Sequence, residues 1–433
     1  MKRAIPAVIA AATALTLVLA GCSGDEEPAD PNAPVTLTLA GWSLASTPEF
    51  KTLADGFRAT HPNVTVELKE YDATNYDTQM TADLAAGTAP DLYVLKNLKN
   101  FYTYQNGGQL REVTELAADL DDVPSLAAYQ VDGKTYAVPY RADSWVLYYN
   151  KELFEKAQVA LPDGSWTWDD YAARAKELTS GLKATGSTAT GAYLHVWQST
   201  VQGFALAQTP NADLLSGDFG FLKPYYQRSL DLQAAGAQPS FGTANTNKLT
   251  YQAQFGKQQS AMMVMGTWYI ATLLAQRESG DADTFEWGIA PVPQFDTSTA
   301  GTSATPVTFG DPTGLGINPK ISGSKLPAAQ AFLSYVAGEE AGKALAGIGI
   351  TPARFSEPVT QALFGLDGVP QDDLSKFAFA THTTKPENPV SKHTAGLQNL
   401  LNEMHTAVLS NSKGVDAAVD EAQKRAKNEV LNQ

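Results

Sequence analysis

The sequence predicts an α/β protein built of two lobes, each a mainly parallel sheet flanked by helices. Apolar residues alternate over 35–42, repeat at helical spacing over 50–57 and return as a strand from residue 64. A second helix, expected from 76 to 86, stops at Gly87, and the apolar run "PDLYVL" follows as a strand of the kind buried in a parallel sheet. A similar alternation starts again after 141, and loose connections near 141 and 295 divide the chain into two lobes.

The elements of the second half follow from equally local signals. "YQVDGKTYAVPY" predicts a hairpin that turns on Asp132-Gly133, and Thr167 with Asp170 predicts a capped helix. The stretches "GAYLHVWQ", "SAMMVM", "WGIAPVP" and "VTFGDPTGLGI" have the composition of strands. A stretch rich in Gly, Ser and Thr covers 297–305, and the chain is mainly helical after Leu326.

The first residues have the layout of a secretory signal peptide. Lys2 and Arg3 precede an almost wholly apolar run over 4–20, and the only cysteine of the chain, Cys22, follows directly. The four residues that end in Cys22 resemble a bacterial lipobox, which implies cleavage after 21 and lipidation of the cysteine; an ordinary signal peptide with a stray thiol is the alternative. Residues 22–34 are then expected to form a flexible tether that holds the protein at the outer face of the cell membrane.

Composition narrows the function classes. The 433 residues carry a formal net charge of −15, and so acidic a surface repels phosphate backbones and argues against a nucleic-acid partner. The five histidines are scattered without metal-ligand spacing, so we expect no metal and no cofactor. No nucleophile elbow, zinc-protease motif or phosphate loop is present, and the chain is therefore not expected to be an enzyme.

An ordered set of motifs resembles the extracellular solute-binding proteins of carbohydrate ABC transporters, the group that includes the maltodextrin-binding protein. The motifs are "LTLAGW", "PDLYVL", "YAVPYRADSWVLYYNKELFEKA", "WTWDDY", "SAMMVMGTW", "APVPQ" and "GITPAR". The resemblance implies a type II periplasmic-binding-protein-like fold, with one lobe at 35–140 and 296–337 and the other at 141–295 and 338–433. It also implies a monomer that takes a sugar between its lobes and delivers it to ABC permease subunits in the membrane.

A sugar site needs aromatic faces for its C–H surfaces and charged or amide groups for its hydroxyls. Trp42, Lys96 and Asn97 follow predicted strands at the edge where open α/β sheets bind ligands, and His195 and Trp197 are expected on one side of a strand. The resemblance adds Asp143, Trp268 and Arg354. The complete candidate set is Trp42, Lys96, Asn97, Arg141, Asp143, His195, Trp197, Trp268, Tyr269, Asp311 and Arg354.

Other interpretations stay open. Arg141 and Asp143 could form a salt bridge between the lobes, and Trp42 or Trp268 could simply fill a core. Tyr148-Tyr149 resembles the paired tyrosines of some ferric-ion carriers, whose shape is similar. A secreted glycosidase would need two carboxylates, for which Asp169-Asp170 and Asp121-Asp122 are weak candidates. The late segment "TAGLQNLLNEMHTAV" lacks the aromatic pair of the maltodextrin-binding protein, which argues against an extended maltodextrin ligand.

Overall fold

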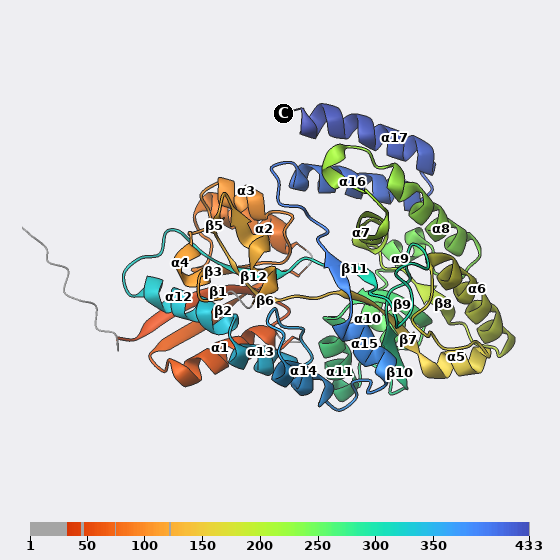
Figure 1. Cartoon of the computed structure of the whole chain (residues 1–433), viewed down its shortest axis with the longest axis horizontal. Helices are drawn as coiled ribbons and strands as arrows, with labels where there is room; N and C mark the ends of the chain where they lie inside the picture. Colours follow the sequence, from red (N-terminus) through yellow and green to blue (C-terminus); the bar gives the residue numbers. More distant parts are fainter. Residues whose placement is uncertain (1–32, 45–46, 74, 121–122, 433) are drawn as a thin grey trace, which may run out of the picture.

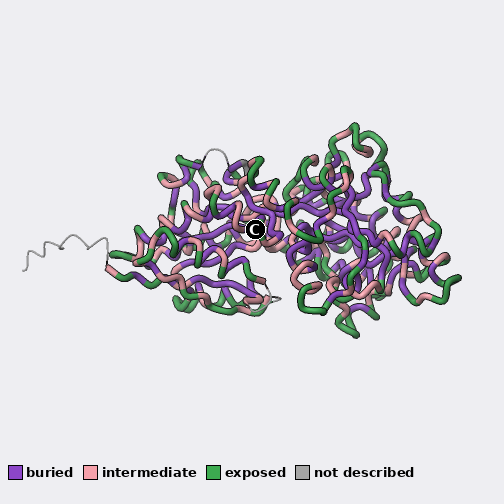
Figure 2. The backbone as a smooth tube through the Cα atoms, turned by 90° about the horizontal axis from the view of Figure 1, so that it is seen from below, coloured by how far each residue is buried: buried purple, intermediate pink, exposed green. Residues whose placement is uncertain are grey.

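The chain forms two lobes, each with its own hydrophobic core (Figure 1). The computed structural model describes residues 33–44, 47–73, 75–120 and 123–432. The expected signal peptide, Cys22, most of the tether and the pair Asp121-Asp122 lie outside the described residues. Buried backbone gathers in two separate regions on either side of the junction (Figure 2).

The first lobe is a five-stranded mixed sheet. Its strands lie in the order β2 (Val64–Tyr71), β1 (Val35–Trp42), β3 (Leu92–Leu95), β12 (Thr313–Ile317) and β6 (Val138–Arg141). Strand β1 runs parallel to β2 and β3, whereas β12 is antiparallel to β3 and β6. Its remaining elements are α1 (Glu49–Thr60), α2 (Tyr76–Ala86), α3 (Phe101–Asn106), α4 (Thr114–Ala117), η1 (Pro124–Tyr129), β4 (Gln130–Val131), β5 (Lys134–Thr135), α12 (Lys325–Val336) and α13 (Glu339–Ala346).

The second lobe holds a four-stranded sheet and a small parallel pair of strands. The sheet order is β10 (Trp287–Ala290), β7 (Trp145–Asn150), β9 (Ser260–Gly266) and β8 (Thr190–Tyr193), and β11 (Val307–Phe309) pairs with β13 (Thr383–Lys385). The helices are α5 (Lys151–Ala157), α6 (Trp168–Ala184), α7 (Ser199–Gln208), η2 (Leu214–Ser216), η3 (Gly220–Leu222), α8 (Lys223–Ala234), α9 (Phe241–Thr246), α10 (Tyr251–Gly256), α11 (Tyr269–Ser279), α14 (Glu357–Phe364), α15 (Asp373–Ala380), α16 (Thr394–Leu409), α17 (Val415–Arg425) and η4 (Ala426–Leu431).

The expectation of mainly parallel sheets is corrected by this strand pairing. In the second sheet β7 is antiparallel to both β10 and β9, and only β8 runs parallel to its neighbour. Strands β7 and β12 follow the passages between the lobes, so each enters its sheet from the junction and runs against its neighbours. The alternation of strands and helices in the sequence does not reveal that β7 and β12 run antiparallel to their neighbours.

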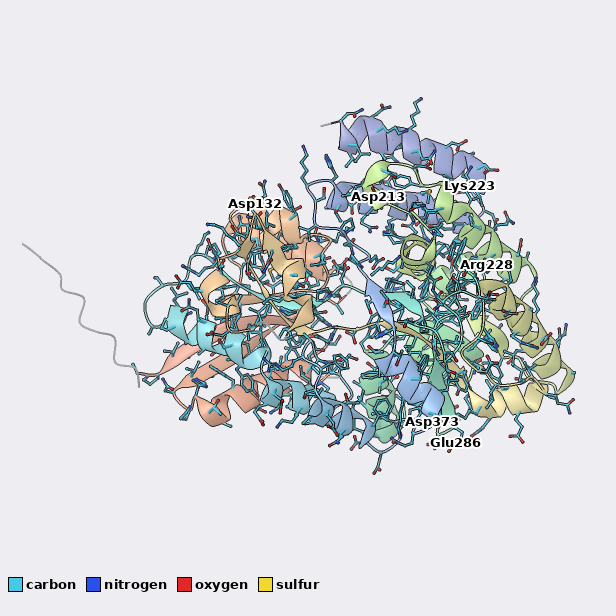
Figure 3. The ribbon with its side chains drawn as sticks, in the orientation of Figure 1. Asp132, Asp213, Lys223, Arg228, Glu286 and Asp373 are labelled. Carbon is cyan, nitrogen blue, oxygen red and sulfur yellow. The ribbon has the colours of Figure 1, made fainter. Side chains whose placement is uncertain are left out.

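Several local predictions are confirmed. Helix α2 ends at Ala86, and Gly87 follows with a φ of 76°, the left-handed conformation that glycine adopts at low cost. Thr167 and Asp170 form a reciprocal capping box at the start of α6. Asp132 and Gly133 have φ values of 51° and 76° at the tip of the hairpin of β4 and β5, on the outside of the first lobe (Figure 3).

Three short segments carry the chain between the lobes. The first, 142–144, joins β6 to β7. Core membership changes again between Phe309 and Leu315 and between Ala353 and Val359. The expectation had placed these two passages near 296 and 338. Residues around Gln294 instead stay on the second lobe, because the backbone N–H of Gln294 donates to the Trp166 carbonyl. Helix α13, around residue 340, contacts α1 and so stays on the first lobe. We therefore propose lobe boundaries at 142–144, 310–312 and 354–358.

Candidate functional site at the lobe junction

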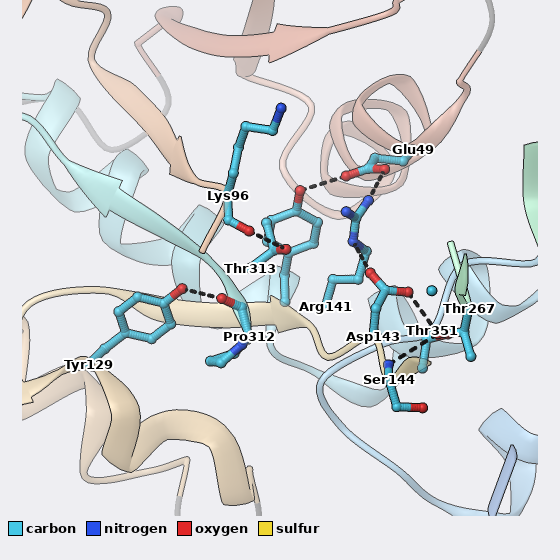
Figure 4. Close-up of polar contacts among 12 residues, drawn as sticks. Glu49, Lys96, Tyr129, Arg141, Asp143, Ser144, Thr267, Pro312, Thr313 and Thr351 are labelled. Carbon is cyan, nitrogen blue, oxygen red and sulfur yellow. Dashed lines mark hydrogen bonds and ion pairs between the residues drawn. The ribbon is translucent and has the colours of Figure 1, made fainter. Parts of the chain in front are cut away.

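An ion-pair network lies where the first passage leaves β6. Glu49, in the first turn of α1, is completely buried and accepts hydrogen bonds from Arg141 at 2.6 Å and from the Tyr140 hydroxyl at 2.5 Å (Figure 4). Arg141 Nε lies 2.7 Å from Oδ2 of Asp143 as an ion pair. The guanidinium thus lies between two carboxylates, one from α1 and one from the passage itself.

The network continues into the second lobe through threonine hydroxyls. Thr267, which follows β9, donates to Oδ1 of Asp143 at 2.9 Å and accepts a hydrogen bond from the Thr351 hydroxyl at 2.8 Å. The backbone N–H of Ala142 donates to the Thr351 carbonyl. Asp143 and Thr351 belong to two different stretches at the junction, and Thr267 joins them. Burial raises the pKa of Asp143, and the Arg141 charge opposes that shift.

The predicted salt bridge between Arg141 and Asp143 is therefore present. Asp143 is 7% exposed, and its two carboxylate oxygens contact Arg141 and Thr267. A ligand hydroxyl would have to share these oxygens with protein donors. The geometry favours a role in holding the junction, with any ligand contact as an addition to it.

Trp42 is covered by a lysine. Its ring is 8% exposed and packs edge-on against Phe50 and Tyr76. Lys96 Nζ lies 4.7 Å from the centre of the Trp42 ring and donates to the Ala73 carbonyl at 2.7 Å. Burial lowers the pKa of Lys96, and the nearby Asp77 charge opposes the shift. Lys96 is therefore more exposed than the Trp42 indole that it covers. Asn97 caps its own loop by accepting from the Lys99 N–H at 3.0 Å.

Four rings of the second lobe form one cluster beside the junction. His195, Trp197, Tyr251 and Trp268, here called the aromatic group, are linked by ring-centre distances of 4.4 Å (His195 to Trp197), 5.6 Å (Trp197 to Tyr251) and 6.4 Å (Trp197 to Trp268). Trp197 is 40% exposed, a large exposure for an indole in contact with three other rings. Trp268 directly follows Thr267, which belongs to the ion-pair network of Arg141 and Asp143, so the aromatic group lies next to that network.

The secondary structure that carries the aromatic group was predicted from the sequence only in part. "GAYLHVWQ" was expected to be one strand, but β8 ends at Tyr193, and His195 and Trp197 lie in the connection to α7. Their rings meet because the chain turns there. The expected close approach at Gly266 is confirmed: a Cβ added at this position would lie 1.9 Å from the Trp268 ring.

Three other predicted residues are engaged by the protein itself. Tyr269 is fully buried in the core of the second lobe, with its hydroxyl on the Gln252 carbonyl. Asp311 is occupied by four protein donors from both lobes: the backbone N–H groups of Leu98, Glu387 and Asn388 and the side-chain amide of Asn388. Arg354 donates to the Ala337 carbonyl at 3.0 Å. The Tyr269 ring still contacts Tyr251 of the aromatic group at a ring-centre distance of 5.3 Å, from the core side. Within the described part of the chain, no ring or hydrogen-bond contact links Asp311 or Arg354 to that group.

Two residues of the junction were missed. Glu49 was not singled out because an acid in the first turn of a helix is ordinary, and its partner Arg141 lies 92 residues away. Tyr251 begins α10, and burial raises its pKa to about 12. A cap threonine followed by an aromatic residue was the only local signal for Tyr251.

Two hollows lie within the second lobe. A groove between α16 and α17 has an apolar floor that includes Leu400 and Met404, with the Lys413–Glu421 ion pair at its rim. No first-lobe residue lines it. Within the described ranges, no helix is long and apolar enough to cross a membrane, and no cluster of His, Cys, Asp or Glu has the arrangement of a metal site.

The chain belongs to the bacterial extracellular solute-binding proteins, whose family model matches residues 41–343. A sugar transporter from Rhizobium etli, crystallised in an open conformation, is 30% identical with a TM-score of 0.76 over 91% of this chain and 99% of that one. The GacH receptor of Streptomyces glaucescens is 22% identical with a TM-score of 0.70 over 92% of this chain and 99% of that one, a likeness of fold alone. The two-lobed, periplasmic-binding-protein-like fold is thus confirmed.

Curated relatives match over a shorter stretch. The melibiose/raffinose/stachyose-binding protein of Bacillus subtilis is 29% identical over 161 residues, which is 36% of each chain. The alignments therefore span only about a third of the length of these relatives.

Proposed function

We propose that this protein captures a sugar between its lobes and delivers it to the permease of an ABC importer. The observation that carries the proposal is the aromatic group: an indole that is 40% exposed stands with three other rings beside the network that joins the lobes. The sugar-transporter and sugar-binding relatives support the same ligand class.

The chemistry of the junction suits a polyhydroxylated ligand. Indole and phenol faces cover sugar C–H surfaces without competing for its hydroxyl groups. Lys96 and Asn97 on the first lobe supply polar groups, and a hydrogen bond that involves a charged group contributes about 1.5–3 kcal/mol. A ligand that contacts both lobes binds best when the lobes approach each other, so it shifts the conformational population toward the closed form.

The two alternative functions have less support. Tyr148 and Tyr149 are 0% and 2% exposed in the core of the second lobe, and the Tyr148 hydroxyl donates to the Gly266 carbonyl, so the pair is not arranged to hold a ferric ion. Asp170 is used in the cap of α6, which leaves Asp169 without a partner carboxylate for glycoside hydrolysis. A binding protein without cofactor or catalysis remains our proposal.

Membrane attachment is part of the proposal. The single cysteine at the end of the apolar leader would carry acyl chains that hold the monomeric protein at the outer face of the membrane, close to its permease. Mass spectrometry of the protein purified from membranes tests this: wild type should carry a diacylglyceryl mass on its first residue, and Cys22→Ala should be released into the medium. An unmodified, fully secreted wild type would contradict the anchor.

Sugar binding is tested by a thermal-shift screen over neutral mono- and oligosaccharides. A sugar at 100 times its dissociation constant should add about 2.7 kcal/mol to the stability of the folded state. Trp197→Ala should abolish the shift. Phe295→Ala provides the control because Phe295 is exposed to a similar degree, 44%, and makes no ring contact with the aromatic group. Equal shifts in both variants, or no shift with any sugar, would contradict the proposal.

A further inference from the structure

The hydrogen bonds of Tyr193 determine the position of the proton on His195. The Tyr193 hydroxyl lies 2.9 Å from the Leu249 carbonyl and 2.9 Å from Nδ1 of His195. A carbonyl oxygen only accepts, so the single hydroxyl proton is donated to Leu249. The Tyr193 oxygen then accepts from Nδ1–H of His195, and in the neutral imidazole the other nitrogen, Nε2, must carry a lone pair.

That lone pair has no partner in the described part of the chain. Nε2 makes no hydrogen bond there, and it is not sealed from solvent although His195 as a whole is 8% exposed. The ring is enclosed edge-on by Trp197 at 4.4 Å and by Tyr251 at 5.4 Å. Nε2 is thus an unused acceptor on a ring that contacts Trp197 and Tyr251 of the aromatic group.

His405 gives an internal comparison. Its Nε2 donates to the Val196 carbonyl, and its Nδ1 accepts from the Tyr226 hydroxyl, so both nitrogens are used inside the lobe. Because Val196 directly precedes Trp197, His405 helps to hold the backbone of the exposed indole. Of these two buried imidazoles, His405 is satisfied by the fold and His195 is left with a free acceptor.

The imidazole of His195 stays neutral at neutral pH. Burial lowers its pKa to about 4, and no charged neighbour contributes to the shift. The groups packed around it are aromatic: Tyr193, Trp197 and Tyr251. A neutral ring with a fixed Nδ1–H cannot donate from Nε2.

We propose that His195 is a specificity-determining residue whose Nε2, fixed as an acceptor by Tyr193, receives a hydrogen bond from a ligand hydroxyl group. The inference rests on the proposed sugar-binding function for the identity of its donor. It predicts selection at one ligand position for O–H over methoxy, and against phosphate or carboxylate oxygens, because two acceptors would then face each other.

The tautomer can be measured without any ligand. In protein labelled with ¹⁵N on its histidine rings, long-range ¹⁵N–¹H spectra at pH 7 should show His195 as Nδ1–H, assigned by the signals that disappear in His195→Asn. Tyr193→Phe removes the acceptor for Nδ1–H and should yield a mixture of tautomers. An Nε2–H or a doubly protonated ring in wild type would overturn the inference, even if a sugar binds.

Binding measurements then test the role of Nε2, using the best sugar from the screen. His195→Asn places an amide near the Nδ1 position and provides no acceptor at Nε2, and we expect affinity to fall about tenfold. His195→Gln places a carbonyl oxygen near Nε2 and should recover part of that loss. His393→Asn, on a histidine at the start of α16 and outside the aromatic group, is the control and should bind like wild type.

A panel of singly O-methylated forms of that sugar completes the test. One derivative should bind wild type about tenfold more weakly than the parent sugar, and His195→Asn should lose this discrimination. If His195→Asn discriminates as wild type does, Nε2 is not the acceptor. A failed sugar screen together with an Nδ1–H tautomer would support the fixed acceptor and overturn a sugar as its donor, so the two failures are distinguishable.

Discussion

The Arg141 guanidinium, at the end of β6, lies 2.7 Å from the carboxylate of Asp143, two residues further on in the first passage between the lobes. A terminal nitrogen of the same guanidinium lies 2.6 Å from Glu49, so one cation is shared by two buried acids. The arrangement explains how three ionic groups lie together at a junction with little solvent. It also makes each member costly to remove.

Replacing Glu49 should strongly destabilise the first lobe. The Glu49 side chain is 0% exposed and that of Arg141 is 12% exposed, and removing one partner of a buried pair costs about 3–5 kcal/mol. We expect Glu49→Ala to lower the free energy of unfolding by about 3 kcal/mol, measured by urea denaturation. Asp55→Ala, in the exposed Lys51–Asp55 pair of the same helix, should cost less than about 1 kcal/mol. Similar losses in the two variants would refute a special role for Glu49.

Adding one methyl group at Gly266 should displace the Trp268 indole. A Cβ there would lie 1.9 Å from the ring, far inside van der Waals contact, and the indole has to move. Gly266→Ala should therefore shift tryptophan fluorescence and weaken sugar binding at least tenfold.

Gly242 provides the matched control for this substitution. It lies in α9, and a Cβ there finds its nearest neighbour only at 4.0 Å. Gly242→Ala should leave binding intact and stabilise the helix by up to about 1 kcal/mol. Unchanged binding in Gly266→Ala would show that the position of Trp268 does not matter to the ligand.

Stability should fall as the pH rises from 6.5 to 8 because of Glu387. Burial raises the pKa of this carboxyl to about 8, with the Asp311 charge adding to the shift. The unfolded carboxyl has a pKa of about 4.3, so in this window the folded state holds one proton and the unfolded state none. The free energy of unfolding should then fall by about 1.4 kcal/mol per pH unit below the folded pKa, and the fall should level off as the pH passes about 8.

Glu387→Gln isolates this contribution. Gln does not titrate, so the difference in unfolding free energy between wild type and variant should depend on pH between 6.5 and 8 and become flat above that range. Urea denaturation at half-unit pH intervals measures it. A constant difference across the window would mean that Glu387 is already ionised in the folded protein.

The buried imidazole of His405 should give the opposite dependence in acid. Burial lowers its pKa to about 4, against about 6.5 when unfolded. The contribution of His405 is fully present above pH 6.5 and is lost as the pH falls toward 4, because only the unfolded state takes up the proton. Comparing wild type with His405→Gln at pH 5 and 6 should show a slope difference of about 1.4 kcal/mol per pH unit. Parallel curves would contradict a neutral, buried His405.

Most of the fold could be predicted from local patterns. The ends of α2, the capping box of α6 and the hairpin tip at Asp132 depend on neighbouring residues alone, and the sequence displays those neighbours. The lobe passages were harder. Strand β11 is paired with β13, about 76 residues later, and such pairing leaves no periodic signature in either segment.

The sequence predicted which residues belong to the candidate site better than it predicted what each of them does. Trp197 and Trp268 were found from composition and resemblance, and the structure brings their rings within 6.4 Å. Trp42 was expected to face a ligand, but the cation that covers it comes from a different strand. Contacts between distant segments decide which aromatic face remains open, and single-sequence patterns do not encode them.

The joining of Asp143, Thr267 and Thr351 has a mechanical consequence. Three stretches of backbone run between the lobes, and Thr267 links Asp143 in the first stretch to Thr351, which lies just before the third. A single connecting segment would allow the lobes to twist as well as bend relative to one another. Segments that are hydrogen-bonded to a common residue resist twisting, so bending at the junction is the easier motion.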